Sequence, residues 1–189
     1  MKKLLILGLI IINLSGCVAT AIIAGAGIGG SILYDKRSIS TMIDDKHTTQ
    51  TAQNLINSNP SLKGRSNISV TTFNHITLLV GQAQTPALKQ LAYDLASRVP
   101  NITRLYNQIE VAGSVSDIQT TNDTWLTSKV KTALITKGSL RDAQIKVVTE
   151  NNIVYLMGET TPLQGEKVAN ITRRVPGVTK VVKVFQYLR

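Results

Sequence analysis

The sequence has little of the side-chain chemistry that most metal sites and disulfide-rich proteins use. Its 189 residues include one cysteine and two histidines, which excludes an internal disulfide framework and a cysteine-based zinc cluster. Aromatic residues make up 4% of the chain, with a single tryptophan, and charged residues make up 17%. Hydrophobic residues reach 43%, so we expect most of the chain to fold around a core, as one mid-sized domain or two small ones.

Acidic residues are also scarce, and the chain is therefore strongly basic. Lysine and arginine number 21 against 11 aspartates and glutamates, which gives a formal charge of +10. Such a balance indicates an acidic partner, namely nucleic acid, an anionic membrane or another polyanion. The compartment decides among these partners.

The N-terminus resembles the signal peptide of a bacterial lipoprotein. In MKKLLILGLIIINLSGC, two lysines precede an apolar run that is too short to span a bilayer comfortably. LSGC at residues 14–17 resembles the lipobox, in which the cysteine thiol receives a diacylglycerol and cleavage occurs just before it. We therefore predict residues 1–16 as a signal peptide and Cys17 as the lipidation site. The alternative is an incidental cysteine after a signal anchor.

Cleavage at this site would leave 189 − 16 = 173 residues with a formal charge of +8. An aspartate after the lipidated cysteine tends to retain such lipoproteins at the inner membrane, and here the residue is Val18. We therefore predict a lipid anchor in the outer membrane with the chain facing the periplasm. This address argues against nucleic acid as the partner.

Residues 17–43 are predicted to form a lipid-anchored flexible tether. The stretch at 18–33 is apolar and rich in glycine, but it lacks the strand–turn–helix context of a dinucleotide-binding loop. A glycine-mediated helix contact is the alternative to a tether.

The rest of the chain contains one unit twice, at a spacing of 76 to 78 residues. NISVTTFNHITLLVGQAQTP in the first copy aligns with QIKVVTENNIVYLMGETTP in the second. Two copies are too few for a solenoid, so we predict tandem domains at residues 44–113 and 114–189. Gly81 and Gly158 align, and we interpret both as structural positions with an unusual φ or close backbone packing.

The element order αββαβ follows from the second copy. Asp123 is interpreted as a helix cap, ahead of apolar residues at helical spacing, and Asp44 and Asp45 as helix-entry acids in the first copy. The later elements are expected as a strand at 145–149, a tight turn at Asn151-Asn152, a strand at 153–157 ended by Gly158, a helix near 162–174 and a strand at 178–187. This predicts an α+β fold in which each domain packs a three-stranded mixed sheet against two helices.

The αββαβ repeat, the glycine at the second strand and the V-P-G-V turn before the last strand resemble the BON domain, a bacterial periplasmic module. A lipobox followed by two copies is similar to the dual-BON outer-membrane lipoproteins. The resemblance implies a non-enzymatic protein that binds anionic phospholipid, such as phosphatidylglycerol or cardiolipin, and supports outer-membrane integrity. It also implies membrane contact through the second domain, enrichment at division sites and a link to the β-barrel assembly machinery.

The second copy also carries more positive charge. Residues 114–189 contain eleven basic and six acidic side chains, net +5, whereas residues 44–113 contain six and four, net +2. On the first helix of the second copy, Trp125 and Lys129 are four residues apart and share a face, and tryptophan favours the membrane–water interface. The aligned residue of the first copy is His47. The predicted phospholipid contacts are Trp125, Leu126, Lys129, Val130, Lys131 and Ile135.

Alternatives remain for this surface. Trp125 could instead lie in the core or between the two domains, as in an envelope scaffold whose domains pack on each other. Lys129 and Lys131 could form an ordinary solvated face, and Arg173 and Arg174 could be partners of a helix dipole rather than of lipid. The basic face could also dock on an acidic protein, which would make the chain an adaptor with incidental lipid binding.

We predict that the chain is not an enzyme, with no catalytic residue, no cofactor and no metal. No glycine-rich phosphate loop or nucleophile arrangement is visible in the sequence, and both histidines lie in the first copy. His75 is interpreted as an exposed residue of a hairpin turn.

Overall fold

The computed structural model describes residues 37–113, 120–137 and 144–188, and the compact unit Lys36–Arg189 contains both predicted domains. The signal peptide, Cys17 and the glycine-rich stretch lie outside the described residues. The first domain consists of α1 (Ile39–Ser58), β1 (Ser66–Phe73), β2 (Ile76–Ala83), α2 (Pro86–Ser97), β3 (Arg104–Asn107) and β4 (Glu110–Val111). The second consists of α3 (Thr120–Thr136), β5 (Gln144–Glu150), β6 (Ile153–Thr160), α4 (Pro162–Arg173) and β7 (Lys180–Tyr187).

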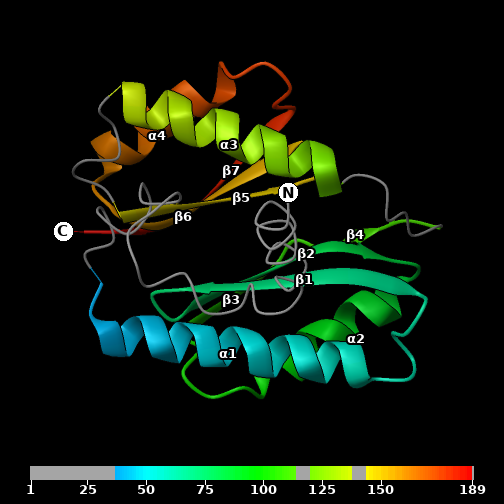
Figure 1. Cartoon of the computed structure of the whole chain (residues 1–189). Helices are drawn as coiled ribbons and strands as arrows, with labels where there is room; N and C mark the ends of the chain where they lie inside the picture. The colour runs from blue at the N-terminus through cyan, green and yellow to red at the C-terminus, as the bar shows by residue number, and fades with distance from the viewer. Residues whose placement is uncertain (1–36, 114–119, 138–143, 189) are drawn as a thin grey trace, which may run out of the picture. The chain divides into compact units, whose positions relative to one another are not determined.

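This order confirms the predicted α+β fold with two αββαβ domains (Figure 1). In each domain the hairpin is antiparallel and the last strand pairs in parallel with the second, which gives the mixed sheet. The first domain differs in one respect, because its last strand is divided into β3 and β4, both paired with β2. At this division the backbone amide of Ile109 donates a hydrogen bond to the side-chain oxygen of Asn107.

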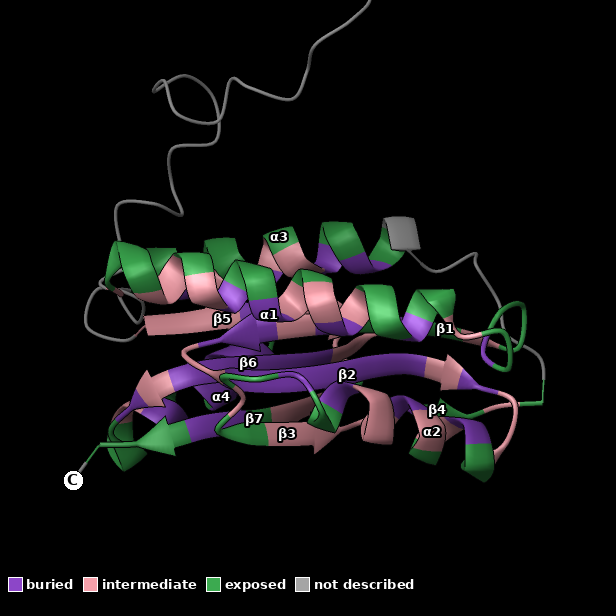
Figure 2. Cartoon of the chain, turned by 90° about the horizontal axis from the view of Figure 1, so that it is seen from below, coloured by how far each residue is buried: buried purple, intermediate pink, exposed green. Residues whose placement is uncertain are grey.

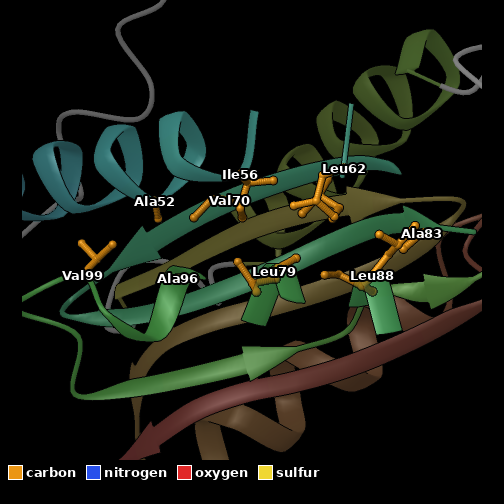
Figure 3. Close-up of a cluster of buried hydrophobic side chains, with 12 residues drawn as sticks. Ala52, Ile56, Leu62, Val70, Leu79, Ala83, Leu88, Ala96 and Val99 are labelled. Carbon is orange, nitrogen blue, oxygen red and sulfur yellow. The ribbon is translucent and has the colours of Figure 1, made fainter. Parts of the chain in front are cut away.

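The helices of each domain cover one face of its own sheet. In the first domain, Ala52 and Ile56 of α1 pack over Val70, Leu79 and residues of α2, as Figure 3 shows. In the second domain, the stripe that α3 buries meets β5, β6 and α4; its members are Leu126, Val130 and Leu134, exposed by 1%, 0% and 0%. Burial of these helical stripes against a sheet is what holds each αββαβ unit together.

The opposite faces of the two sheets share a third hydrophobic cluster. It contains Phe73, Ile76, Leu78 and Val80 of the first domain and Tyr155, Met157 and Val184 of the second. The side chain of Asn74 also donates a hydrogen bond to Glu159 across this contact. Because β2 and β6 are covered on both faces, they are buried along most of their length (Figure 2). The two domains therefore pack on each other through their sheets.

Each hairpin turns at two residues of positive φ, as a two-residue type I′ connection requires. The φ values are 51° and 61° at Asn74 and His75, and 51° and 62° at Asn151 and Asn152. Asparagine tolerates this conformation better than most residues, which explains its place in both copies.

A buried aspartate holds each turn, and this corrects the interpretation of Asp123 as a helix cap and of Asp45 as a helix-entry acid. Asp45 accepts hydrogen bonds from the amides of Asn74 and His75, at 2.7 and 2.9 Å. Asp123 does the same for the second turn, where its carboxylate lies 2.8 and 2.9 Å from the two amides. Both aspartates lie inside their helices, because α1 begins at Ile39 and α3 at Thr120.

Two element boundaries differ from the prediction. Ser38 caps α1 by accepting a hydrogen bond from the amide of Thr41, so α1 begins at Ile39, within residues 17–43 that were predicted as the tether. Gly158 does not end its strand, because β6 continues to Thr160. At both Gly81 and Gly158 φ is positive, and an added Cβ would lie 2.1 and 1.8 Å from a backbone oxygen of the neighbouring strand.

Candidate functional site

Only some of the predicted contact residues lie on the exposed side of α3. Leu126 and Val130 are exposed by 1% and 0%, because they supply the stripe that packs on the second sheet. The prediction that these two side chains contact lipid is therefore wrong for this fold. Trp125 and Ile135 are exposed by 61% and 50%, and Lys131 is exposed as well.

Trp125 and Lys129 form one unit on the side of α3 that faces α4. The Lys129 ammonium lies 3.9 Å from the centre of the Trp125 ring, a cation–π contact that orients both side chains. The same ammonium donates a hydrogen bond of 2.6 Å to the carbonyl of Pro176, just after α4. Lys129 therefore ties the exposed indole to the end of the neighbouring helix. The high exposure of Trp125 also contradicts the alternative in which it is buried between the domains.

Lys131 and Ile135 lie across the exposed side of α3, away from this pair. The helix rotates by about 100° per residue, so they fall toward the side where Thr127 donates a hydrogen bond to Thr149 of β5. The predicted contact residues therefore divide into two groups, of which the Trp125 group faces α4.

Two shallow grooves run along the seam between α3 and α4. One, of about 450 Å³, is lined by Trp125, Ser128, Lys129, Thr132, Ala133, Lys137, Ile171, Arg174, Val175 and Pro176. The other, of about 600 Å³, is lined by Lys137, Leu163, Glu166, Lys167, Asn170, Ile171 and Arg174. The grooves share Lys137, Ile171 and Arg174, so they are continuous.

The grooves are basic. Four cationic side chains line them, namely Lys129, Lys137, Lys167 and Arg174. The single carboxylate in the lining, Glu166, accepts a hydrogen bond from Lys183 of β7. This bond lowers the pKa of the carboxyl, and the lysine compensates its negative charge. Sequence analysis missed Lys137, Lys167 and the exposed Leu163. The spacing of Leu163, Lys167, Ile171 and Arg174 on one face of a helix could have indicated them.

The first domain provides an internal comparison, since its helices align with an offset of 78 residues for α1 and 76 for α2. Trp125 and Lys129 correspond to His47 and Thr51. The other three cations, at 137, 167 and 174, correspond to Asn59, Leu91 and Arg98. At these four aligned positions the first domain therefore has one cationic residue, whereas the second domain has four.

The carboxylate with the largest upward shift lies elsewhere, at the end of β5. Burial, then the charges of Asp123 and Glu110, raise the pKa of Glu150 from 4.5 to about 7. Burial also raises the pKa of Tyr155, in the cluster between the sheets, to about 12. Neither residue lines a groove.

In the described ranges, no group of three or more histidine, cysteine, aspartate or glutamate side chains is arranged to hold a metal ion. Nor is any helix in those ranges both long and apolar enough to cross a membrane.

Comparisons with known proteins agree with the resemblance seen in the sequence. The BON domain matches residues 44–113 and 122–189. The outer membrane lipoprotein DolP of Haemophilus influenzae is 34% identical over 188 residues, which cover 100% of this chain and 97% of that protein. The 21 kDa hemolysin of Actinobacillus pleuropneumoniae is 32% identical over 155 residues, or 82% of this chain and 80% of that protein. Among solved structures, the C-terminal domain of CdsD, the structural protein of the type III secretion system of Chlamydia trachomatis, is similar over 77% of this chain and 67% of that chain. The sequence identity is 18% and the TM-score is 0.30.

Proposed function

This chain belongs to the BON domain family, with two copies of the domain, and on that premise we propose that it is an outer-membrane lipoprotein of the DolP type that binds anionic phospholipid through its second domain. The proposed role is non-enzymatic. The full-length similarity to an outer membrane lipoprotein supports the location, together with the lipobox at Cys17.

The observation that carries the lipid-binding proposal is the pair formed by Trp125 and Lys129. A tryptophan with 61% exposure is unusual unless it meets a partner, and at a membrane its ring lies at the level of the headgroups. The Lys129 ammonium lies over this ring, so with the indole at the headgroup level it would be within reach of lipid phosphates. A shallow insertion of Trp125 with nearby cations on phosphates would give binding that prefers anionic lipid and weakens with salt.

The lipid anchor would raise the effective affinity of this surface for the membrane. Acyl chains on Cys17 would hold the chain to the inner leaflet of the outer membrane. Arg37 follows Cys17 by twenty positions, a distance along the chain that can span at most about 70 Å when extended. The second domain would therefore meet the leaflet at a high local concentration, so a modest intrinsic affinity would suffice.

The wider role that we propose follows from the family. A protein that reads anionic lipid from within the periplasm would support outer-membrane integrity and would gather where phosphatidylglycerol or cardiolipin is enriched, as at division sites. A contact with the β-barrel assembly machinery is the rival proposal, in which the basic face of the second domain docks on protein.

Vesicle binding by residues 36–189 tests the proposal. This unit is compact and contains all three hydrophobic clusters, and circular dichroism will verify its fold. We expect the fluorescence of the single tryptophan to shift to the blue with phosphatidylglycerol or cardiolipin vesicles and not with phosphatidylcholine. In vesicle flotation, Trp125→Glu should abolish binding, whereas His47→Glu, the same change at the aligned site, should leave it intact.

Unchanged flotation of a folded Trp125→Glu variant would overturn lipid contact at this surface. A discrete protein adduct as the dominant product of crosslinking from position 125 in cells would favour the adaptor.

A further inference from the structure

The contact between the two sheets carries carboxyl groups at one end. On β5, Val148 packs against the hydrophobic cluster between the sheets. Side chains alternate between the two faces of a strand, so Glu150 lies on the same face of β5. Its partner in the β5–β6 register, Ile153, packs against the same cluster. The half-buried carboxyl group of Glu150 is therefore on the face that the second domain turns toward the first.

The first domain contributes a second carboxyl group to this contact. Val80 of β2 belongs to the cluster between the sheets, so Gln82 lies on the same face of β2. Glu110 of β4 is paired with Gln82 in register, and paired residues of neighbouring strands share a face. Glu110 is exposed, so this end of the contact is at the rim, where water and protons have access.

The charge of Glu110 acts across the boundary between the domains. Burial contributes most to the raised pKa of Glu150, followed by the negative charges of Asp123 and Glu110. Glu110 and Glu150 also raise the pKa of Tyr155, after burial, and Tyr155 is exposed by 2% within the cluster between the sheets. A like charge at this range disfavours the ionised form of Glu150.

Other titratable side chains lie on the facing surfaces of β3, β5, β6 and β7, by the same alternation; they are Arg104, Tyr106, Lys146, Glu159 and Lys180. Lys146 precedes Glu150 by four residues, about 13 Å along the strand, and Lys180 flanks Ile153 on the side away from Glu150. Glu159 accepts a hydrogen bond from Asn74 of the other domain's hairpin turn. Both charges that shift the pKa of Glu150 are nevertheless negative.

The aligned position of the first domain is occupied differently. Glu150 aligns with Phe73, an apolar member of the cluster, and the guanidinium of Arg37 lies 3.9 Å from the centre of that ring. Arg37 also forms an ion pair with Asp45, the aspartate that aligns with Asp123. The fold therefore accepts an apolar residue beside a compensated aspartate here, and the carboxyl group is particular to the second domain.

We propose that the contact between the two domains is a pH-dependent closure, which is stable while Glu150 carries a proton and loosens when Glu150 and Glu110 are both ionised. With its proton, the carboxyl group is neutral and its half-burial against the other sheet costs little. Without it, negative charges from the two domains face each other, and separation of the sheets returns both to water. Opening would expose the apolar faces of β2 and β6 that the closed contact covers.

The direction of the effect follows from proton linkage. In the closed state the pKa of Glu150 is about 7, and separation would return it toward the ordinary value of 4.5. The proton therefore favours closure fully below pH 4.5, and this contribution is lost as pH rises to about 7. The full shift would change the opening equilibrium roughly thirtyfold between pH 5.5 and 8. We expect about three- to tenfold, because Asp123 still acts on Glu150 after separation and water screens a half-buried group.

Thiol labelling of the compact unit Lys36–Arg189, which lacks Cys17, measures this opening. Met157→Cys places a thiol between the two sheets, and Leu156→Cys places one on the opposite face of β6, under the second domain's own helices. Both native side chains are exposed by 0%. Each labelling rate is divided by that of a small reference thiol at the same pH, because the thiolate fraction also rises with pH. Protection of the Met157→Cys thiol should fall about three- to tenfold between pH 5.5 and 8, and that of the Leu156→Cys thiol should fall less.

Second substitutions in the Met157→Cys protein identify the groups responsible. Glu150→Gln should abolish the pH dependence and keep protection high at pH 8, and Glu110→Gln, in the other domain, should reduce the dependence. Glu159→Gln is the matched control, since it makes the same change on the facing surface of β6 and should keep the full response. Protection that does not vary with pH, or an undiminished response in Glu110→Gln, would overturn the closure. An equal fall at the Leu156→Cys thiol would overturn it too, since pH would then act on the folding of the second domain itself.

Discussion

The substitution Asp123→Ala removes the carboxylate that holds the second hairpin turn, on the helix that carries Trp125. Its two oxygens accept hydrogen bonds from the amides of Asn151 and Asn152 at 2.8 and 2.9 Å, and the residue is exposed by 7%. Alanine would leave both amides without this partner, in a turn where both residues already have positive φ. The start of α3 would also lose its attachment to the β5–β6 hairpin.

The magnitude follows from those two bonds. A hydrogen bond to a charged group contributes about 1.5–3 kcal/mol net, so two contribute about 3–6 kcal/mol. Water can reach the half-buried turn and replace part of the loss, so we expect Asp123→Ala to lower the free energy of unfolding by about 3 kcal/mol. For a unit of this size, such a loss lowers Tm by about 6–12 °C.

Urea unfolding of residues 36–189, followed by the fluorescence of Trp125, measures this loss in the domain that suffers it. Asp94→Ala serves as a control, because that carboxylate accepts an exposed hydrogen bond from Gln90, and should cost under about 0.5 kcal/mol. Asp123→Asn should also be destabilised, because an amide can accept from one turn N–H while its NH₂ group faces the other. A loss below about 1 kcal/mol for alanine, or an asparagine variant as stable as wild type, would refute the role of the carboxylate.

Three further substitutions test the remaining features of the fold. Gly158→Ala would place a Cβ 1.8 Å from the backbone oxygen of Gln144 and should prevent folding in a thermal melt, whereas Gly64→Ala, also at positive φ but in open space, should cost about 1–2 kcal/mol. Met157→Asp would bury a charge between the two sheets, so we expect the domains to separate, with a larger radius of gyration by X-ray scattering and helical circular dichroism retained. The pKa of Glu150 is raised from 4.5 to about 7, so the folded state holds this proton more tightly than the unfolded state and wild type should lose stability as pH rises between those values. Glu150→Gln should lack this slope and be more stable than wild type at pH 8 by about 1 kcal/mol, after allowance for partial exposure, and a parallel pH profile for the two proteins would contradict the shift.

Most of the fold was accessible from the sequence because its signals are local. The hairpin at Asn151-Asn152 follows from a turn dipeptide between two apolar runs, and the helices follow from periodicity that occurs in both copies. The role of Asp123 was not accessible, because its partners lie 28 and 29 residues away and an aspartate near a helix start reads first as a cap. The run ITLLV at the start of β2 did contain one usable signal, since a continuous apolar strand indicates two covered faces.

The contact surface was predictable in part for the same reason. A spacing of four residues placed Lys129 beside Trp125, and the structure puts the ammonium over the ring. The assignment of Leu126 and Val130 to lipid was wrong because a single helical stripe cannot both fill the core and meet a membrane. The contribution of α4 requires knowledge of which helices are neighbours, and no pattern within one helix contains it.

The packing of the domains limits where a partner can bind. Each sheet has one face under its own helices and the other face against the sheet of the other domain, so neither face is available while the domains stay together. The helix layers and strand edges remain. Of the two helix layers, α1 and α2 carry His47, Thr51 and Leu91 where α3 and α4 carry a tryptophan and two lysines. Since the two layers share one fold, the fold itself does not require this difference in charge, and the anionic partner that we propose for the second domain would account for it.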